Sequence, residues 1–450
     1  MALTGIEIFK LLPKTNCKKC GFPTCLAFAM KVAQGQAKIE DCPEASEEIK
    51  SKLRDAATPP IIEVQFGTDS MKLKIGGQNV LFRHEKKFLN PTVLALEVAD
   101  DDSEIETRID EVLNSSIERV GETLRIEAIY LKNRSADISK YRDALERILK
   151  KAPQIPLILG VSSSDIAIDS LSILKGHRPI LHGATAENIE EMAKVAAKFN
   201  VPLVVSAKGV EAVIPLTEKA KALGVGDLII NAEPKSIGEL LRDNTFIARG
   251  ALKKQIRSVG YPIITFAWGK DDFYETIVST VGILKYSSIL VLKRTLPWKN
   301  LALFTIRQNI YSDPQVPMQV KQGIYRVGEP DDKSPFIVTT NFALTYFLVK
   351  GEIENSKIPV WLGIMDCDGL SVLTAWAAGK FSASKIAQFV KESGIEEKLN
   401  HRELIIPGYV AMLKASIEDK LSGWKVVIGT KEASGIPAFL RNYVRSKNDR

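Results

Sequence analysis

Short apolar runs rich in β-branched residues recur along the middle of the chain, separated by stretches with a helical period. Residues 187–199 and 216–224 show this clearly, because their apolar positions follow i, i+3, i+4 spacing. Strand and helix units that repeat every 25 to 35 residues or so are typical of a TIM (β/α)8 barrel. We therefore predict such a barrel over residues 61–311, with strands at 93–97, 128–131, 157–161, 179–181, 203–205, 228–230, 263–266 and 289–292.

The alternation resumes near the end of the chain after a passage rich in Pro, Gly and Asp. That passage, residues 312–335, has neither a helical nor a strand period, and we interpret it as a linker. The segment 336–450 predicts a Rossmann-like or flavodoxin-like α/β domain, with strands at 336–339, 360–364, 404–406 and 426–428. Open α/β sheets bind ligands beyond the carboxyl ends of their strands.

The N-terminal residues 1–57 form a third predicted domain. Two short amphipathic helices are expected around a group of cysteines, and Thr58-Pro59-Pro60 then interrupts the helical pattern and is predicted to be a linker. The complete prediction is an α/β protein of three parts: a small cysteine-bearing domain, a central barrel and a C-terminal α/β domain.

Composition narrows the function classes. The net charge of +7 is spread among 61 basic and 54 acidic residues, without a basic block, which argues against nucleic acid as a partner. No apolar stretch has the length of a membrane span, and the first residues do not form a signal peptide, so we expect a cytoplasmic protein. The five cysteines are unevenly placed, and four of them cluster between positions 17 and 42, which indicates metal and not disulfides.

The clustered cysteines have the spacing Cys17-x2-Cys20-x4-Cys25-x16-Cys42. Four thiolates meet the ligand count of a 4Fe-4S cluster, in which each iron takes one cysteine. Gly21 and the nearby prolines suit tight loops between ligands. The alternative is a zinc site with four cysteines, although zinc ribbons usually present two C-x2-C pairs instead of one.

The segment LLPKTNCKKCGFPTCLAFAMKVAQG, followed by EDCP, a barrel and a small α/β domain, resembles the large subunit of the corrinoid iron-sulfur protein. This family is also known as the gamma subunit of the acetyl-CoA decarbonylase/synthase complex, and the resemblance covers essentially the whole chain. It implies a 4Fe-4S cluster on Cys17, Cys20, Cys25 and Cys42, and a corrinoid on the C-terminal domain.

The resemblance also suggests where the corrinoid lies. In WLGIMDCDGLSVLTAWAAGKFSA a strand turns at Asp368-Gly369 and continues as a helix, and the family places this loop on the lower axial side of cobalt. No D-x-H-x-x-G motif supplies a histidine ligand, so we expect the base-off form. Each position has the plainer interpretation of an ordinary βα turn with a helix cap. The expected contact residues are Leu370, Ser371, Val372, Leu373 and Thr374, with Ala433 on a second turn and Thr340 and Tyr346 on the rim.

The function implied is a methyl carrier of the reductive acetyl-CoA (Wood-Ljungdahl) pathway. It accepts a methyl group from methyltetrahydrofolate through a separate methyltransferase and delivers it to acetyl-CoA synthase, while the cluster reductively reactivates Co(II). A smaller barrel subunit, forming a heterodimer, and a reductive activator are further implied partners. Two alternatives stay open: a pterin-dependent methyltransferase with an iron-sulfur module, and an electron-transfer protein without corrinoid.

Several other candidates are given structural roles. His84, His177 and His182 have no partner at a catalytic or zinc-binding spacing, and Cys367 stands alone. The polar residues at the barrel strand ends occupy the positions where TIM-barrel active sites form, but fold analogy alone does not make them catalytic. These residues are Glu97, Asp165, Lys208 and Asn231.

Overall fold

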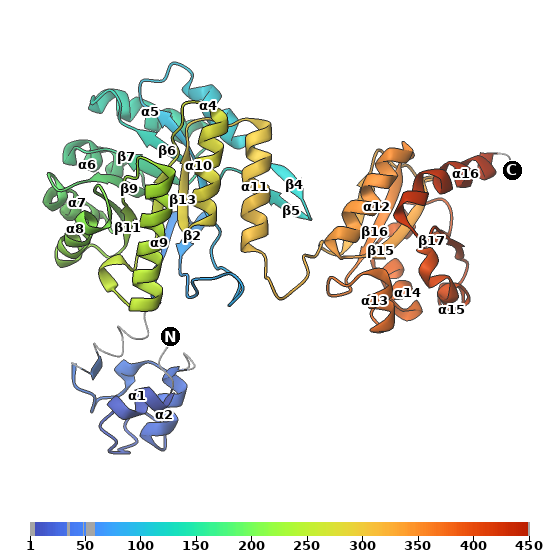
Figure 1. Ribbon diagram of the computed structural model, residues 1–450, viewed down its shortest axis with the longest axis horizontal. Coiled ribbons are helices and arrows are strands. Elements are labelled where there is room, and N and C mark those ends of the chain that lie inside the picture. Colours follow the sequence, from blue (N-terminus) through green and yellow to red (C-terminus); the bar gives the residue numbers. More distant parts are fainter. Residues whose placement is uncertain (1–4, 34–36, 48, 51–58, 449–450) are drawn as a thin grey trace. The chain divides into compact units, whose positions relative to one another are not determined.

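The computed structural model describes residues 5–33, 37–47, 49–50 and 59–448 (Figure 1). It divides into two compact units, one of Met1–Ile117 with Leu124–Ser312 and the other of Glu118–Thr123 with Asp313–Arg450. Thr58 of the predicted linker lies outside the described residues. No helix in the described part of the chain is both long enough and apolar enough to cross a membrane.

The N-terminal module has the two predicted short helices. Helix α1 (Gly5–Leu11) packs against α2 (Cys25–Ala33), and the 3-10 turn η1 (Ile39–Asp41) follows. A small core holds them together, formed by Ile8, Leu12, Phe28 and Ile39 together with the thiol groups of Cys25 and Cys42. Two cysteines are thus part of the module's own hydrophobic core.

The predicted barrel is confirmed. Eight parallel strands close into a ring in chain order, because the last strand, β13, pairs with the first, β3, through the register Ile289↔Val93. The strands are β3 (Val93–Ala99), β6 (Ala128–Lys132), β7 (Leu157–Gly160), β9 (Ile180–Ala184), β10 (Leu203–Ser206), β11 (Leu228–Asn231), β12 (Ile263–Phe266) and β13 (Ser287–Leu292).

Helices surround the barrel, and the side chains on the two faces of each strand pack into two different hydrophobic cores. In β10, Val204 points into the barrel interior, whereas Leu203 and Val205 pack under the helices. Strands with both faces buried have continuous apolar sequences, which is why the eight runs were visible. The helices are α4 (Ile105–Leu113), α5 (Ile138–Lys151), α6 (Ser164–Ile173), α7 (Ile189–Phe199), α8 (Val210–Ala222), α9 (Ile237–Lys254), α10 (Asp272–Leu284) and α11 (Pro297–Tyr311).

Three strands that the sequence did not predict form a separate antiparallel sheet in the order β2-β1-β8. Val64, Phe66 and Ile75 of this sheet join the same core as the barrel interior. The sheet therefore closes one end of the barrel with apolar side chains. Its strands are β1 (Glu63–Thr68), β2 (Lys72–Gly76) and β8 (His177–Arg178), and a separate short hairpin consists of β4 (Ile117–Arg119) and β5 (Glu122–Leu124).

The second unit is an α/β domain with a five-stranded sheet in the order β14-β16-β15-β17-β18. All neighbouring strands are parallel except β14 and β16, which pair antiparallel. The chain passes from β15 to β16 on one side and returns to β17 on the other, so the topological switch point lies between β15 and β17. The strands are β14 (Gly323–Val327), β15 (Phe336–Thr340), β16 (Val360–Met365), β17 (Glu403–Ile406) and β18 (Lys425–Ile428).

Strand β14 corrects one sequence-based expectation. We interpreted 312–335 as a linker without strands, yet residues 323–327 within it hydrogen-bond along β16. The polar and glycine-rich sequence hid this strand because it lies at the sheet edge, where one side of the backbone and much of the side-chain surface face solvent. The helices of the domain are α12 (Ala343–Ser356), α13 (Val372–Ala377), α14 (Ala383–Glu392), α15 (Lys414–Lys420) and α16 (Ile436–Asn448).

Candidate functional site

The cysteine loop of the N-terminal module is held by its own side chains. Thr24 caps α2 through its hydroxyl, which accepts a hydrogen bond from the Ala27 N–H at 3.1 Å. This places Cys25 in the first turn of the helix, where the partial positive charge of the N-terminus faces a thiolate. Cys42 directly follows η1, and its N–H bonds back to the carbonyl of Ile39 at 3.1 Å.

Left-handed backbone conformations are concentrated around the first two cysteines. Lys14, Asn16 and Lys18 have φ angles of +58°, +49° and +62°, and Gly21 has +83°. Alternation of this kind turns successive N–H groups toward one side of the loop and forms the concave nests that bind anions, including the sulfur atoms of iron-sulfur clusters. Three non-glycine residues in a costly conformation indicate a loop shaped for a ligand.

Charge and burial distinguish the four thiols. Cys25 and Cys42 are buried, while Cys17 and Cys20 are half-buried. Lys19, beside Cys20, forms a 2.6 Å ion pair with Glu44, two residues after Cys42, and so ties the two ligand loops together. That hydrogen bond to Glu44 also raises the pKa of Lys19.

The four side chains are not arranged around a single point. In the described ranges, no three His, Cys, Asp or Glu side chains converge as the ligands of one metal ion. The thiolates of a 4Fe-4S cube bind four different irons, so they do not need to converge in that way. A zinc ion would require all four sulfur atoms in one tetrahedron.

The α/β domain contains an apolar cavity of about 270 Å³ at the carboxyl ends of its strands. Its floor is formed by β15 and β17, which flank the topological switch point, and helices α12 and α16 form one wall. Gly408, just beyond β17, permits close packing of the loops there, because a Cβ at this position would lie 2.7 Å from the Gly429 carbonyl oxygen. The lining residues are Ile337, Val338, Thr339, Thr345, Leu348, Val349, Ser371, Val372, Leu373, Ile405, Ile406, Pro407, Tyr409, Gly429, Thr430, Lys431, Glu432, Ala433, Ile436 and Phe439.

Half of the sequence-predicted contact residues line this cavity. Ser371, Val372, Leu373 and Ala433 do so. Among the others, Leu370 packs against the domain core, and Thr374 is exposed and bonds to the Ser371 hydroxyl at 3.0 Å.

The remaining two predicted positions, Thr340 and Tyr346, are buried and lie outside the cavity lining. The Tyr346 ring packs against Tyr325 and Phe347, and burial raises the pKa of its hydroxyl to about 12. It therefore has the environment of a core residue. Sequence reasoning found the loop after β18 through Ala433 but missed the loop after β17, although Pro407-Gly408 follows that strand directly and could have indicated it.

The buried hydroxyl of Thr339 indicates what kind of ligand the cavity could bind. Thr339 is 1% exposed and lines the cavity, and its hydroxyl oxygen has no hydrogen-bond partner among the residues that the structure describes. Leaving a buried hydroxyl unpaired costs about 1–3 kcal/mol, so such groups usually meet a ligand or water. The residues present therefore fit a largely apolar ligand that brings one polar group to Thr339.

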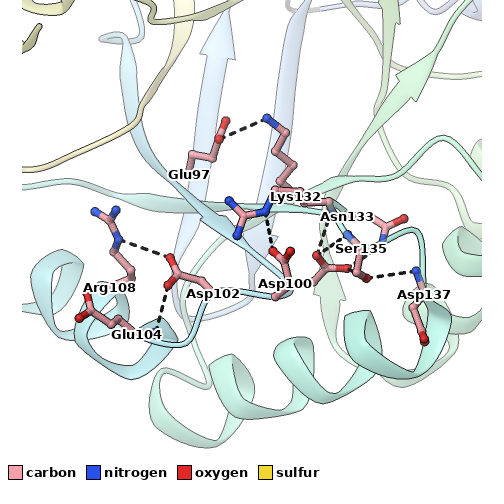
Figure 2. A network of polar contacts seen from close by, with 11 residues as sticks. Glu97, Asp100, Asp102, Glu104, Arg108, Lys132, Asn133, Ser135 and Asp137 are labelled. Carbon is pink, nitrogen blue, oxygen red and sulfur yellow. Dashed lines mark hydrogen bonds and ion pairs between the residues drawn. The ribbon is translucent and has the colours of Figure 1, made fainter.

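The carboxyl ends of the first two barrel strands carry a polar network, shown in Figure 2. Glu97 on β3 pairs with Lys132 on β6 at 3.3 Å. Asp100 accepts hydrogen bonds from the Ser135 hydroxyl and the Asn133 amide, both at 2.6 Å, and from the Arg134 N–H at 2.9 Å. Asp100 is thus fully engaged in holding the loop after β6, and its role is structural.

His182 lies inside the barrel, where its ring packs against the rings of Tyr130 and Phe266. Its two ring nitrogens contact the Tyr130 hydroxyl at 3.0 Å and the Ser206 hydroxyl at 3.3 Å. Burial lowers the pKa of His182 to about 4, so the ring is neutral at physiological pH. This agrees with the structural role expected for it from the sequence.

These features define a class: a protein that joins a small module with four clustered cysteines to a parallel barrel and to an α/β domain with an apolar cavity at its switch point. The family of the CO dehydrogenase/acetyl-CoA synthase delta subunit matches residues 63–440, and a family described by its Fe-S cluster matches residues 12–44. The chain belongs to the first of these families, and the resemblance noted from its sequence is confirmed.

Relatives match over nearly the whole chain. The corrinoid/iron-sulfur protein large subunit of Moorella thermoacetica is 40% identical over 98% of this chain and 99% of its own. The acetyl-CoA decarbonylase/synthase complex subunit gamma of Methanopyrus kandleri is 35% identical over 97% of each chain. Among solved structures, dihydropteroate synthase from Thermus thermophilus has a TM-score of 0.40 at 14% identity, and it covers 55% of this chain and 100% of its own.

Proposed function

We propose that this chain is a methyl carrier of the reductive acetyl-CoA pathway, with a 4Fe-4S cluster on its N-terminal module and a base-off corrinoid on its α/β domain. The observation that carries the proposal is the combination of the two sites in a chain whose relatives over their full length are named corrinoid/iron-sulfur protein large subunit and complex subunit gamma. We propose that the protein is cytoplasmic.

The cluster would be held by Cys17, Cys20, Cys25 and Cys42. The nest-forming loop of Lys14, Asn16 and Lys18 supports this assignment, because its N–H groups offset the negative charge of bound thiolates and sulfides. The Lys19–Glu44 ion pair keeps the loop of Cys20 beside the loop of Cys42. The module's small core fixes Cys25 and Cys42 from within.

The corrinoid would be held by the carboxyl-end loops of the α/β domain. A cavity of about 270 Å³ is smaller than a complete corrinoid, so only part of the cofactor would enter, and the ring would lie over the mouth. Leu348, Leu373 and Tyr409 line the cavity and are 53%, 44% and 37% exposed. Apolar side chains gathered at a rim are what a large apolar ligand would cover.

When bound, the corrinoid supplies a cobalt that accepts and releases a methyl group, and the cluster supplies single electrons. The chain's residues bind and shield these groups, and partner proteins would catalyse the transfers. We propose as partners a methyltetrahydrofolate-dependent methyltransferase, acetyl-CoA synthase, a reductive activator and a small barrel subunit that completes a heterodimer. A relative is named as a subunit of a complex, and this supports the proposal that the chain has partner subunits.

The rival function is a pterin-dependent methyltransferase in which the barrel does the chemistry. The hydrogen bonds of the barrel residues argue against this function. Asp100 accepts hydrogen bonds from the loop after β6, and His182 bonds to both Tyr130 and Ser206. Glu97 is paired with Lys132. These groups already have partners among themselves, whereas Thr339 in the α/β cavity has none.

The experiment is metal analysis with an anaerobic absorption spectrum of the chain produced together with its small subunit. We expect about four irons and one cobalt per chain and a base-off corrinoid spectrum. If the protein contains iron but no cobalt, even after reconstitution with free corrinoid, the methyl-carrier proposal is wrong and the chain is an electron-transfer protein. Zinc in place of iron would overturn the cluster assignment.

A further inference from the structure

Asn341 follows β15 at the switch point and is 2% exposed. Its side-chain oxygen accepts hydrogen bonds from the backbone N–H groups of Cys367 at 2.9 Å and Gly369 at 3.0 Å. Its side-chain nitrogen donates to Asp366 Oδ1 at 3.0 Å and to Gln319 Oε1 at 3.3 Å. Because backbone N–H groups can only donate, the orientation of the amide is fixed, and both of its ends are used.

Residues 367–370, which follow β16, form a tight turn, and Asn341 bonds to two of them and to the preceding Asp366. Asp368 and Gly369 have φ angles of +55° and +69°, and the Leu370 N–H bonds to the Cys367 carbonyl at 3.1 Å. Two successive positive φ angles are the mark of a type I′ turn, which strongly favours Asp-Gly. The Asp368 N–H also donates to Asp366 Oδ1 at 3.0 Å, so Asp366 and Asn341 hold the turn together.

This turn leads directly into residues that line the cavity. Ser371, Val372 and Leu373 come immediately after it, and α13 begins at Val372. Asn341 itself is absent from the cavity lining. It therefore acts on the cavity through the turn and not by touching a ligand.

We propose that Asn341 is a positioning residue that sets the position of the cavity-lining residues 371–373, against which the corrinoid would lie. This rests on the proposed corrinoid function and goes beyond it, since it assigns the placement of these cavity-lining residues to a buried amide that does not itself line the cavity. The side chain at this position must accept hydrogen bonds from two backbone N–H groups and donate one to a carboxylate. Only an amide side chain can do both. An aspartate would retain the acceptor but would put two carboxylates about 3 Å apart, and like charges at that distance repel strongly.

The test compares Asn341→Asp and Asn341→Ala with Asn400→Asp in the full chain, each reconstituted with corrinoid. Asn400 belongs to the same domain, is exposed, and its side chain donates a hydrogen bond to Asp332. The readouts are the Co(II) electron paramagnetic resonance spectrum, which reports axial ligands, and the midpoint potential of the Co(II)/Co(I) couple. Iron content and circular dichroism verify that each variant has folded.

We expect both Asn341 variants to retain corrinoid, with affinity reduced by about tenfold or less, the equivalent of one hydrogen bond. Their resonance spectra change and their midpoint potentials become more negative, because a loosened loop would admit water to the side of cobalt that faces the cavity. Asn400→Asp matches the wild type. Folded Asn341 variants with an unchanged spectrum and an unchanged potential would overturn the proposal.

A second variant covers the case in which the Asn341 substitutions prevent folding. Asp366→Ala removes an exposed side chain that holds both Asn341 and the Asp368 N–H. We expect a smaller shift in the same direction, and no shift would contradict the proposal. If the wild-type chain itself takes up no corrinoid, the proposed function fails, which is a result distinct from failure of the positioning role.

Discussion

Asn16 and Cys25 exchange two hydrogen bonds. The N–H of Cys25 donates to Asn16 Oδ1 at 2.8 Å, and the N–H of Asn16 donates to the Cys25 sulfur at 3.3 Å. The residue that begins α2 is thus bound to the loop that carries Cys17. Hydrogen bonds to ligand sulfur are one means by which a protein stabilises a cluster and sets its potential.

Replacement of Asn16 by alanine should weaken cluster retention. It removes the acceptor for Cys25 and puts a disfavoured residue at a φ of +49°, for an expected loss of about 1–2 kcal/mol in the module. The measurement is the rate of iron loss to a chelator under anaerobic conditions. Asn16→Gly tolerates the backbone and should show an intermediate rate, so equal rates in all three proteins would contradict this account.

Replacement of Cys20 by alanine should separate the two cofactors. Loss of one ligand damages the cluster, and we expect reductive reactivation of Co(II) to be lost while methyl transfer by pre-reduced protein stays largely intact. The matched control is Cys367→Ala, because Cys367 is buried in the α/β domain and burial raises the pKa of its thiol to about 11, which disfavours a ligand role. Collapse of methyl transfer in a folded Cys20→Ala protein would show that the cluster does more than relay electrons.

Replacement of Thr339 by valine should have opposite effects on stability and on ligand binding. The hydroxyl is buried without a partner, so a nearly isosteric apolar residue should raise the stability of the corrinoid-free protein by about 1 kcal/mol. Affinity for corrinoid should fall, because the polar contact is lost. Thermal unfolding and corrinoid titration measure the two effects.

The control for that experiment lies one residue away. Thr340 is equally buried and its hydroxyl also lacks a partner, yet it does not line the cavity. Thr340→Val should therefore stabilise the protein without changing corrinoid affinity. The same loss of affinity in both variants would argue against the cavity as the binding site.

Asp100 should make the barrel sensitive to acid. Burial opposes ionisation of this carboxyl, but the hydrogen bonds from Ser135, Asn133 and Arg134 outweigh it, and the pKa of Asp100 is lowered. A lowered pKa in the folded state contributes stability above the unfolded-state pKa, and this contribution is lost as the pH falls through the folded-state value. Asp100→Asn should cost about 1–3 kcal/mol at pH 7 and progressively less in acid.

Thermal unfolding of Asp100→Asn and wild type from neutral to acidic pH tests this expectation. Asp101→Asn is the control, since Asp101 is exposed and its ion pair with Arg134 contributes little. A stability difference that stays constant across the pH range would mean that ionisation of Asp100 is not its cause.

The sequence by itself determined the strands of the barrel, and it predicted the cluster ligands. Runs such as 203–205 are apolar at every position because both faces of a barrel strand are buried, and this leaves a clear signal. The four cysteines were identified by type and spacing, which do not depend on the fold. Strands with mixed exposure were missed for the converse reason, since β2 and β14 are short, partly exposed and contain charged residues.

Tertiary structure alone decided which residues meet in the α/β cavity. Leu373 and Ala433 were expected from their loops, but Thr345, Pro407 and Phe439 come from three other segments, and only the packing of helices against the sheet brings them together. Thr340 and Thr339 are neighbours of the same type, yet only Thr339 lines the cavity. Asn341 gave no local signal, because its role depends on Cys367 and Gly369, which lie 26 and 28 residues away along the chain. A side chain that acts through distant backbone groups becomes visible only when the fold has brought those groups within hydrogen-bonding distance.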